Sequence, residues 1–306
     1  LFLPENPLTA RVTVNRMWQE VFGVGLVKTA DDFGSQGEAP VNQELLDWLA
    51  VDFRESGWDV KRFYRRLLLS STYRQEAVAT PRKLEVDPQN RLLSRGPRFR
   101  MDGEMVRDVA LASSGLLAPK IGGPSVKPYQ PEGIWEAVAM HGSNTRFYKE
   151  DEGAGLYRRS MYTFWKRSAP PASMEIFNAP SRENCTVVRE RTNTPLQALV
   201  TMNDPQFFEA ARVLAGRAMT TEPDFSGRLR FLAEHLLARP LTSAEQAIAE
   251  GAYSDYRAYY SNHQEEAHQM LAQGSSAPDP SLPKDEFAAY TMLTNQLMNL
   301  DEVLNK

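Results

Sequence analysis

The residue types best suited to bind another molecule concentrate between positions 156 and 208. This segment holds six arginines and one lysine against three glutamates and one aspartate. Arginine presents a planar fork of N–H donors that matches carboxylate, sulfate or phosphate. Tyrosine, phenylalanine and tryptophan lie between the bases, and their flat faces suit sugar rings or cations. The segment therefore predicts a site for an anionic or carbohydrate ligand.

The candidate ligand-binding residues are the basic, aromatic, amide and acidic side chains of this segment. They are Arg158, Arg159, Tyr162, Trp165, Lys166, Arg167, Arg182, Glu183, Arg189, Arg191, Asn193, Gln197, Asn203 and Asp204. A structural interpretation competes with ligand binding. In that interpretation Arg182 pairs with Glu183, and the bases at 189 and 191 join Glu190 in salt bridges that tie loop to helix.

Two helix starts lie close together near the end of the segment. Thr194-Pro195 and Asp204-Pro205 both place a capping side chain before a proline, which is typical of a helix N-terminus. A tight junction of this kind exposes backbone N–H groups, which attract anions. The alternative is that the amides and the carboxylate around the junction only cap helix ends.

Signals for catalysis are few. Cys185 is the one cysteine, and no histidine is tied to it by spacing, so we expect a buried or idle thiol. His263 and His268 are five residues apart and fall on different helix faces, so no metal pair is expected. The chain has no zinc or haem-attachment motif, and we expect no cofactor in it. Asp204 with Glu183 or Glu190 is the candidate carboxylate pair for glycoside cleavage.

Apolar periodicity and capping signals predict the elements that carry these residues. Helices are expected over 7–22, 42–56, 60–73, 102–114, 242–273 and 285–304, with shorter ones after Thr194 and Asp204. A strand is conceivable only at 157–165. We therefore expect a mainly α fold: a single irregular multi-helix domain over 1–306, with long ordered loops and at most a minor β element. Flexible segments are expected near 142–155 and 274–284.

The whole-chain composition sets further limits. The 306 residues are 42% hydrophobic and 24% charged, as in globular proteins, and the formal net charge is −4. This balance gives no general attraction to nucleic acid. No apolar run approaches the roughly 18 residues of a membrane helix, so no membrane span is expected. The chain begins at Leu1, and we expect it to be a fragment of a larger polypeptide from which a targeting segment could have been removed.

Three dense motifs occur in order along the chain. They are NPLTARVTVNRMWQEVFGVGLVKTADDFGSQGEAP, then ELLDWLA, then YRRSMYTFWKRSAPPASMEIFNAPSRENCTVVRERTNTPLQALVTMNDPQFFEAAR. With the closing NLDEVLNK, they closely resemble the planctomycete cytochrome-c-associated domain of unknown function, family 1553. The resemblance covers essentially the whole chain.

The resemblance implies a cellular location and a position within a larger protein, but it names no reaction. Such domains look like the C-terminal part of large exported proteins, where they often follow a c-type cytochrome module and a second domain of unknown function. Sugar-binding-like modules sometimes accompany them. The resemblance therefore implies an extracytoplasmic (periplasmic or cell-surface) location, with a haem module in the preceding portion and other modules of the same polypeptide as partners.

One position departs from the family pattern. Relatives commonly read Pro-Ser-His-Pro before ELLDWLA, where this chain has Pro40, Val41, Asn42 and Gln43. Either the histidine is not catalytic in the family, or this member has lost the function.

Three hypotheses follow for function. The first is an exported helical module that binds a glycan or another anionic ligand in support of polysaccharide use. The second is a carbohydrate-active enzyme, hydrolytic or redox-linked to a partner cytochrome, in which two carboxylates, or a carboxylate and His141, converge in a cleft. The third is a scaffold that docks other modules and exposes a large apolar patch.

Overall fold

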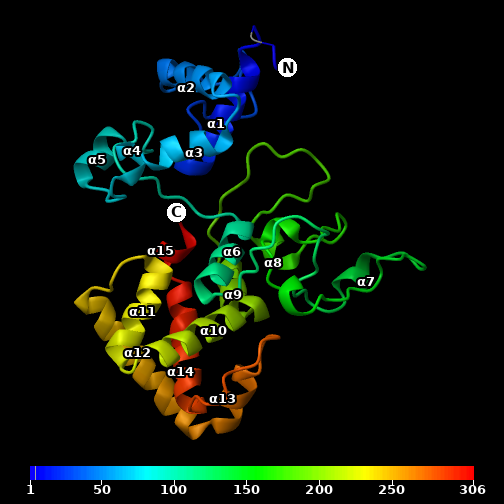
Figure 1. Ribbon diagram of the computed structural model, residues 1–306, viewed down its shortest axis with the longest axis vertical. Coiled ribbons are helices and arrows are strands. Elements are labelled where there is room, and N and C mark those ends of the chain that lie inside the picture. The colour runs from blue at the N-terminus through cyan, green and yellow to red at the C-terminus, as the bar shows by residue number, and fades with distance from the viewer. Residues whose placement is uncertain (4) are drawn as a thin grey trace. The chain divides into compact units, whose positions relative to one another are not determined.

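The chain is mainly α-helical, as the sequence predicts (Figure 1). The computed structural model describes residues 1–3 and 5–306. In these residues β pairing is limited to isolated bridges, two of which join Ala118 to Arg158 and Val126 to Thr163. The strand considered at 157–165 does not form. A short 3-10 helix, η2 (Ser160–Tyr162), interrupts it.

The chain divides into two compact units. Unit 1 comprises Leu1–Phe99, Thr186–Val188 and Lys306, and unit 2 comprises Arg100–Cys185 and Arg189–Asn305. The expectation of one integrated domain stays a prediction, as do the two flexible segments.

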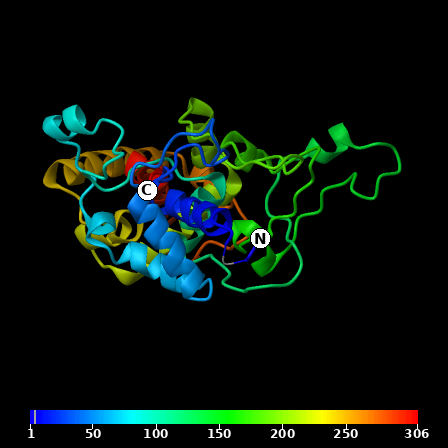
Figure 2. The same ribbon diagram turned by 90° about the horizontal axis from the view of Figure 1, so that it is seen from above.

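Unit 1 is built from helices near the N-terminus. They are α1 (Leu8–Phe22), α2 (Gln43–Glu55), α3 (Val60–Leu68), α4 (Ser71–Arg74) and α5 (Pro81–Val86). Helix α1, dark blue in Figure 2, packs beside α2. The predicted helix over 60–73 is split, because Ser70 caps α4 through the backbone N–H of Tyr73. This capping bond begins a new helix where the periodicity suggested continuity.

One apolar face of α1 contributes to the core of unit 1. Its buried members are Val14, Met17, Trp18, Val21 and Phe22, and they pack against α2 and α3. On α2, Leu45 is only half-buried, and on α3, Leu68 is 40% exposed. The neighbouring Leu67 takes the inward position on α3.

Asn15 fixes the loop that follows α1. It is fully buried among apolar neighbours, donates from Nδ2 to the carbonyl of Val27 and accepts from the N–H of Val27 at Oδ1, both at 2.9 Å. A buried amide needs such partners. Asn42 caps α2 by accepting the N–H of Leu45 at 2.9 Å. Its role here is therefore that of a helix cap.

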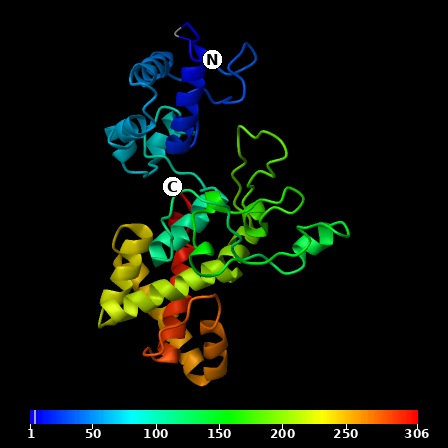
Figure 3. The same cartoon turned by 45° about the vertical axis from the view of Figure 1, so that its right-hand side comes forward.

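Unit 2 contains the remaining helices. They are α6 (Gly103–Ser114), α7 (Ile134–Val138), η1 (Gly153–Gly155), η2, α8 (Ala172–Ile176), α9 (Pro195–Asn203), α10 (Pro205–Thr221), α11 (Phe225–Leu237), α12 (Ser243–Asn262), α13 (Gln264–Leu271), α14 (Lys284–Met298) and α15 (Asp301–Leu304). Figure 3 shows α14, in red, lying against α10, and the two helices share the most extensive contact of the unit.

Small residues allow α10 and α14 to approach closely. Ala211 and Ala215 on α10, like Ala288 and Ala289 on α14, are fully buried. Side chains without atoms beyond Cβ let helix backbones come near each other, and larger apolar residues from α11 and α12 fill the surrounding space. This packing makes α10 the central helix of unit 2.

Helix ends were predicted well where capping chemistry is local. Thr194 and Asp204 cap α9 and α10 as expected, each one residue before its proline. Two breaks were not predicted. The helix expected over 242–273 is divided at His263, and the last helix is divided between α14 and α15 near Asn299.

Side chains of α10 hold the segment that follows α13. Glu209 is fully buried and accepts bonds from the Tyr129 and Tyr157 hydroxyls, both at 2.9 Å, and from the N–H of Ser276 at 2.6 Å. Arg212 donates to the carbonyl of Ser276 at 2.5 Å. The start of the connector predicted near 274–284 is therefore bonded to the core helix. Among the described residues, no helix has both the length and the apolar composition to cross a membrane.

Candidate functional site

The seven basic side chains of the central segment divide into two groups in unit 2. Arg158 represents the first group, whose donors are used inside the protein. Its guanidinium is 5% exposed and donates to the carbonyls of Pro124, Lys120 and Gly122 at 2.9, 3.2 and 2.5 Å. It also stacks on Tyr162, with Cζ 3.8 Å from the ring centre. Arg158 and Tyr162 therefore anchor the loop around residues 120–124.

Lys166 is likewise bound internally. Its ammonium donates to the carbonyl of Thr145 at 2.9 Å and lies 4.8 Å from the centre of the Trp135 ring. Tyr148 and Phe164 pack around the same tryptophan, with ring centroids 4.8 and 5.6 Å from it. The ammonium thus holds the 134–148 segment against a small aromatic core.

Arg189 and Arg191 bind the start of α6. Arg189 Nη1 lies 2.8 Å from Glu104 Oε2 and 3.7 Å from Asp102 Oδ2, and Arg191 Nε lies 4.0 Å from Asp102 Oδ1. The structural interpretation therefore applies to these two bases. Their acidic partners are Glu104 on α6 and Asp102 at its N-cap, whereas the sequence suggested Glu190.

The second group is open to solvent. Arg159, Arg167 and Arg182 are exposed, and within the described residues their guanidinium groups have no hydrogen-bonding or ion-pairing partner. Arg167 lies in a turn closed by the N–H of Ala169, which donates to the carbonyl of Lys166 at 3.0 Å. No pairing of Arg182 with Glu183 occurs in the described chain. All three groups therefore retain donors for an external acceptor.

Arg182 is held by stacking instead of by an ion pair. Its Cζ lies 4.2 Å from the centre of the Trp165 ring, and Trp165 Nε1 donates to the carbonyl of Ser181 at 3.0 Å. Stacking restricts the guanidinium through its flat face. The N–H groups at the edge of the fork stay available, so Arg182 is positioned for a carboxylate or a sulfate before any ligand arrives.

The polar residues of the helix junction have separate roles. Asn193 is exposed, and Asn203 donates to the carbonyl of Leu199 at 2.9 Å. Gln197 is 1% exposed and donates to the carbonyl of Ile176 and to Thr192 Oγ1, both at 3.1 Å. Gln197 therefore braces α9 from within, so the junction residues do not act as one set.

Asp204 has the most unusual chemistry among the predicted residues. Burial raises the pKa of its carboxyl group to about 6, from 3.8, although the N–H of Gln206 and the charge of Arg107 oppose this shift. Nearby negative charge on Glu150 raises it further. The carboxylate that acts on Asp204 is therefore Glu150, whereas the sequence suggested Glu183 or Glu190. A carboxyl group that titrates near neutral pH suits proton transfer.

Arg107, whose charge acts on this carboxyl group, was not predicted. It is 2% exposed, and its guanidinium donates to Gln206 Oε1, to the carbonyls of Leu156 and Arg158, and to Ser160 Oγ, at 2.5, 2.6, 2.8 and 3.2 Å. It thus joins α6, the central segment and the start of α10. The sequence signal was a single base among the apolar residues of α6, GEMVRDVALASS.

Other potential sites show no convergent chemistry. Cys185 is an exposed free thiol. No group of three or more metal-ligating side chains is found in the part of the chain that the structure describes. His141 is exposed, with Nδ1 3.2 Å from Arg146 Nη1, and no described bond links it to a carboxylate.

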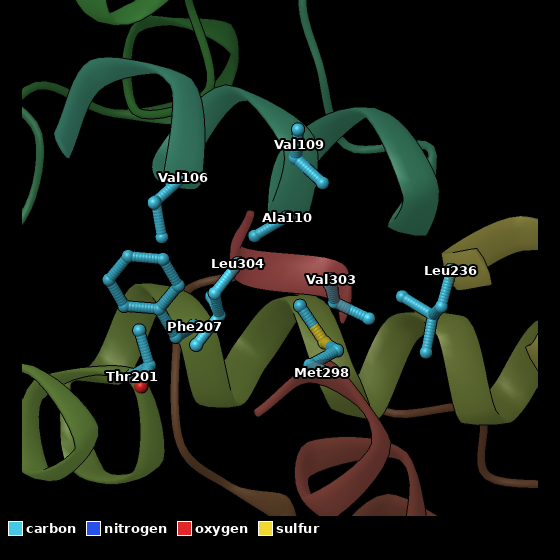
Figure 4. Close-up of a pocket in the computed structure, with 9 residues that line it drawn as sticks. All are labelled: Val106, Val109, Ala110, Thr201, Phe207, Leu236, Met298, Val303 and Leu304. Carbon is cyan, nitrogen blue, oxygen red and sulfur yellow. The ribbon is translucent and has the colours of Figure 1, made fainter. Parts of the chain in front are cut away.

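A cavity of about 10 Å³ lies in the core of unit 2 (Figure 4). Its lining is apolar apart from Thr201 and includes Val106, Phe207, Met298 and Leu304. Such a volume is at most that of one water molecule. We interpret it as a packing gap between α6, α10 and the C-terminal helices. The candidate binding residues lie elsewhere.

Comparisons with known proteins give one match. No curated protein matches the chain, and no solved structure matches it. The family model described as "PSD1: Protein of unknown function (DUF1553)" matches residues 1–253. This match spans most of the 306 residues. The chain therefore belongs to the DUF1553 family.

Proposed function

We propose that the chain is an exported helical module that binds an acidic glycan in support of polysaccharide use. The observation that carries the proposal is the set of three exposed guanidinium groups without internal acceptors, Arg159, Arg167 and Arg182. Trp165 beneath Arg182 adds an aromatic surface. A sugar that bears carboxylate or sulfate presents both an apolar ring face and the anion that such a pair recognises.

The wider context is part of the same proposal. An extracytoplasmic location, with a c-type cytochrome module and further modules on the same polypeptide, would place this chain beside polymers outside the cell. The resemblance to exported multidomain proteins supports this context. The grouping of exposed arginines in the central segment also supports binding of a polyanion there. The net charge of −4 gives the whole chain no general affinity for polyanions.

Replacing Arg182 by glutamine is expected to weaken binding of dextran sulfate about 3–10-fold, because a charge-assisted hydrogen bond is lost. The triple change at Arg159, Arg167 and Arg182 is expected to weaken it about 100-fold if the three act independently. Isothermal titration calorimetry on the full chain measures both. Arg230→Gln, at an exposed position on α11, is the matched control for charge.

Uncharged dextran serves as the control ligand, and it should bind weakly to every variant. Equal affinity of the wild type for the charged and uncharged polymers would contradict the proposal. So would a triple variant that binds dextran sulfate as tightly as Arg230→Gln does.

A carbohydrate-active enzyme is the second candidate. The observation that favours it is the carboxyl group of Asp204, whose pKa of about 6 is set by burial and by Glu150. Such a group holds a proton at slightly acidic pH and can donate it to a leaving group. Asp204→Asn should abolish turnover of any polysaccharide that the wild type cleaves. Wild-type protein that turns over neither sulfated nor neutral polysaccharides would count against this candidate.

A further inference from the structure

Helix α3 in unit 1 separates apolar and basic residues sharply. Its sequence, VKRFYRRLL, contains four bases and no acid. Phe63 and Leu67 are buried in the core of unit 1. Lys61, Arg62 and Arg65 are exposed. The inward side of α3 is therefore occupied by the fold, and the outward side is a concentrated positive surface.

One carboxylate organises half of this charge. Asp52 of α2 lies 3.0 Å from Arg62 Nη2 and also pairs with Arg66. The bond from Arg66 is the main cause that lowers the pKa of Asp52, so this carboxyl group stays ionised at neutral pH. Lys61 and Arg65 have no acceptor in the described chain. Asp59 caps α3 by accepting the N–H of Arg62, so the four bases face two acids, Asp52 and Asp59, and the local charge is +2.

An exposed tryptophan adjoins these bases. Trp48, on α2, is 53% exposed, and the guanidinium carbon of Arg66 lies 4.8 Å from its ring centre. Asp52 also pairs with Arg66. A large aromatic ring in solvent is unusual, because its burial would contribute to folding. Here the ring is oriented by a fixed base and retains exposed area for a ligand.

We propose that Trp48, Lys61, Arg62, Arg65 and Arg66 form a second binding site for an acidic sugar, which we call the α2–α3 surface. The exposed ring of Trp48 would stack on the sugar, and the free donors of Lys61 and Arg65 would bind its sulfate or carboxylate. The choice of ligand class rests on the proposed function, but the site lies in the other unit and uses different residues.

The chemistry favours a soluble acidic sugar over a lipid surface. Leu68 and Leu69 at the end of α3 are exposed and would suit an interface. The ionised Asp52, however, lies among the bases and holds two of them. A carboxylate oxygen can also accept a hydrogen bond from a sugar hydroxyl group, and the exposed face of Trp48 suits a sugar ring. The α2–α3 surface thus presents donors, an acceptor and a ring together.

The test compares three variants of the full chain for binding of dextran sulfate. Trp48→Ala is expected to weaken binding about 3–10-fold, and Lys61→Ala and Arg65→Ala about 2–5-fold each. Arg82→Ala, at an exposed position on α5 in the same unit, removes the same charge as the lysine and arginine changes and should have little effect. Circular dichroism verifies that each variant remains folded.

The outcomes separate this site from the one in unit 2. Two sites are supported if each of the three changes weakens dextran sulfate binding and if this loss of binding free energy adds to the loss caused by Arg182→Gln. If only the variants at Arg159, Arg167 and Arg182 lose affinity, the proposed function stands and the α2–α3 surface is refuted. If only the α2–α3 variants lose affinity, the unit 2 site is the one refuted.

A parallel measurement with lipid vesicles tests whether the α2–α3 surface binds a membrane instead. Vesicles of phosphatidylcholine with phosphatidylglycerol are offered to the same variants. Loss of vesicle binding with dextran sulfate binding unchanged would overturn the proposal in favour of a lipid surface. Variants that bind dextran sulfate as Arg82→Ala does would also overturn it.

Discussion

Arg107→Ala is expected to lower the free energy of unfolding of unit 2 by about 3–5 kcal/mol. The guanidinium is almost completely buried and bonds Gln206, Ser160 and two carbonyl groups from the central segment. Alanine would leave those acceptors buried without donors, and each such group costs about 1–3 kcal/mol. The junction of α6, the central segment and α10 would loosen together.

Hydrogen exchange of the α10 amides across a urea series measures this change in unit 2 separately from unit 1. Arg159→Ala is the matched control, because that side chain is exposed and without an internal acceptor, and its effect should stay within about 0.5 kcal/mol. Arg107→Lys should recover little, since one ammonium cannot reach the acceptors of a planar fork. A loss below about 1 kcal/mol in Arg107→Ala would contradict the structural role given to this residue.

Asp204→Asn is expected to stabilise unit 2 by about 2–3 kcal/mol at pH 7. The pKa of Asp204 is about 6 in the folded chain, against an ordinary 3.8. The folded state therefore keeps a proton at pH values where the unfolded chain has lost it, and stability falls as pH rises through this window. Above pH 6 the carboxylate is ionised in this partly buried position, which disfavours its charge. Asparagine has no charge and is an equally good N-cap for α10.

Unfolding free energies at pH 4 and at pH 7 check this expectation. The wild type should lose about 2–3 kcal/mol between these values that Asp204→Asn retains. Other groups titrate in the same range, so the difference between the two proteins is the informative quantity. The prediction is refuted if Asp204→Asn is less stable than the wild type at pH 7, or if both proteins share one pH profile.

Local sequence signals predicted the helix junction but not its burial. Thr194 and Asp204 precede prolines, and both cap helices because capping depends on residues within one turn. The raised pKa of Asp204 depends instead on its burial in the folded chain and, to a smaller extent, on the charge of Glu150, which lies far from it in sequence. Spacing along the chain carries no information about such contacts. The pairing with Glu183 or Glu190 was chosen from proximity in sequence alone.

The neighbouring arginines Arg158 and Arg159 differ in burial, and the sequence could not predict this difference for the same reason. Arg158 is sealed because the carbonyls of Lys120, Gly122 and Pro124 surround it, whereas Arg159 points to solvent. Helix periodicity could not separate them, since the segment around η2 is irregular. The break at His263 has a similar origin. The apolar pattern continues past it, so periodicity alone did not predict the break between α12 and α13.

The central claim is that the open guanidinium groups of unit 2 bind an acidic sugar, and arginine Nε–Hε signals in NMR spectra test it most directly. On addition of a dextran sulfate oligosaccharide, the signals of Arg159, Arg167 and Arg182 should shift in proportion to bound ligand, while those of the sealed Arg107 and Arg158 stay in place. The account is contradicted if the three exposed arginines do not respond, or if an uncharged dextran oligosaccharide moves them equally.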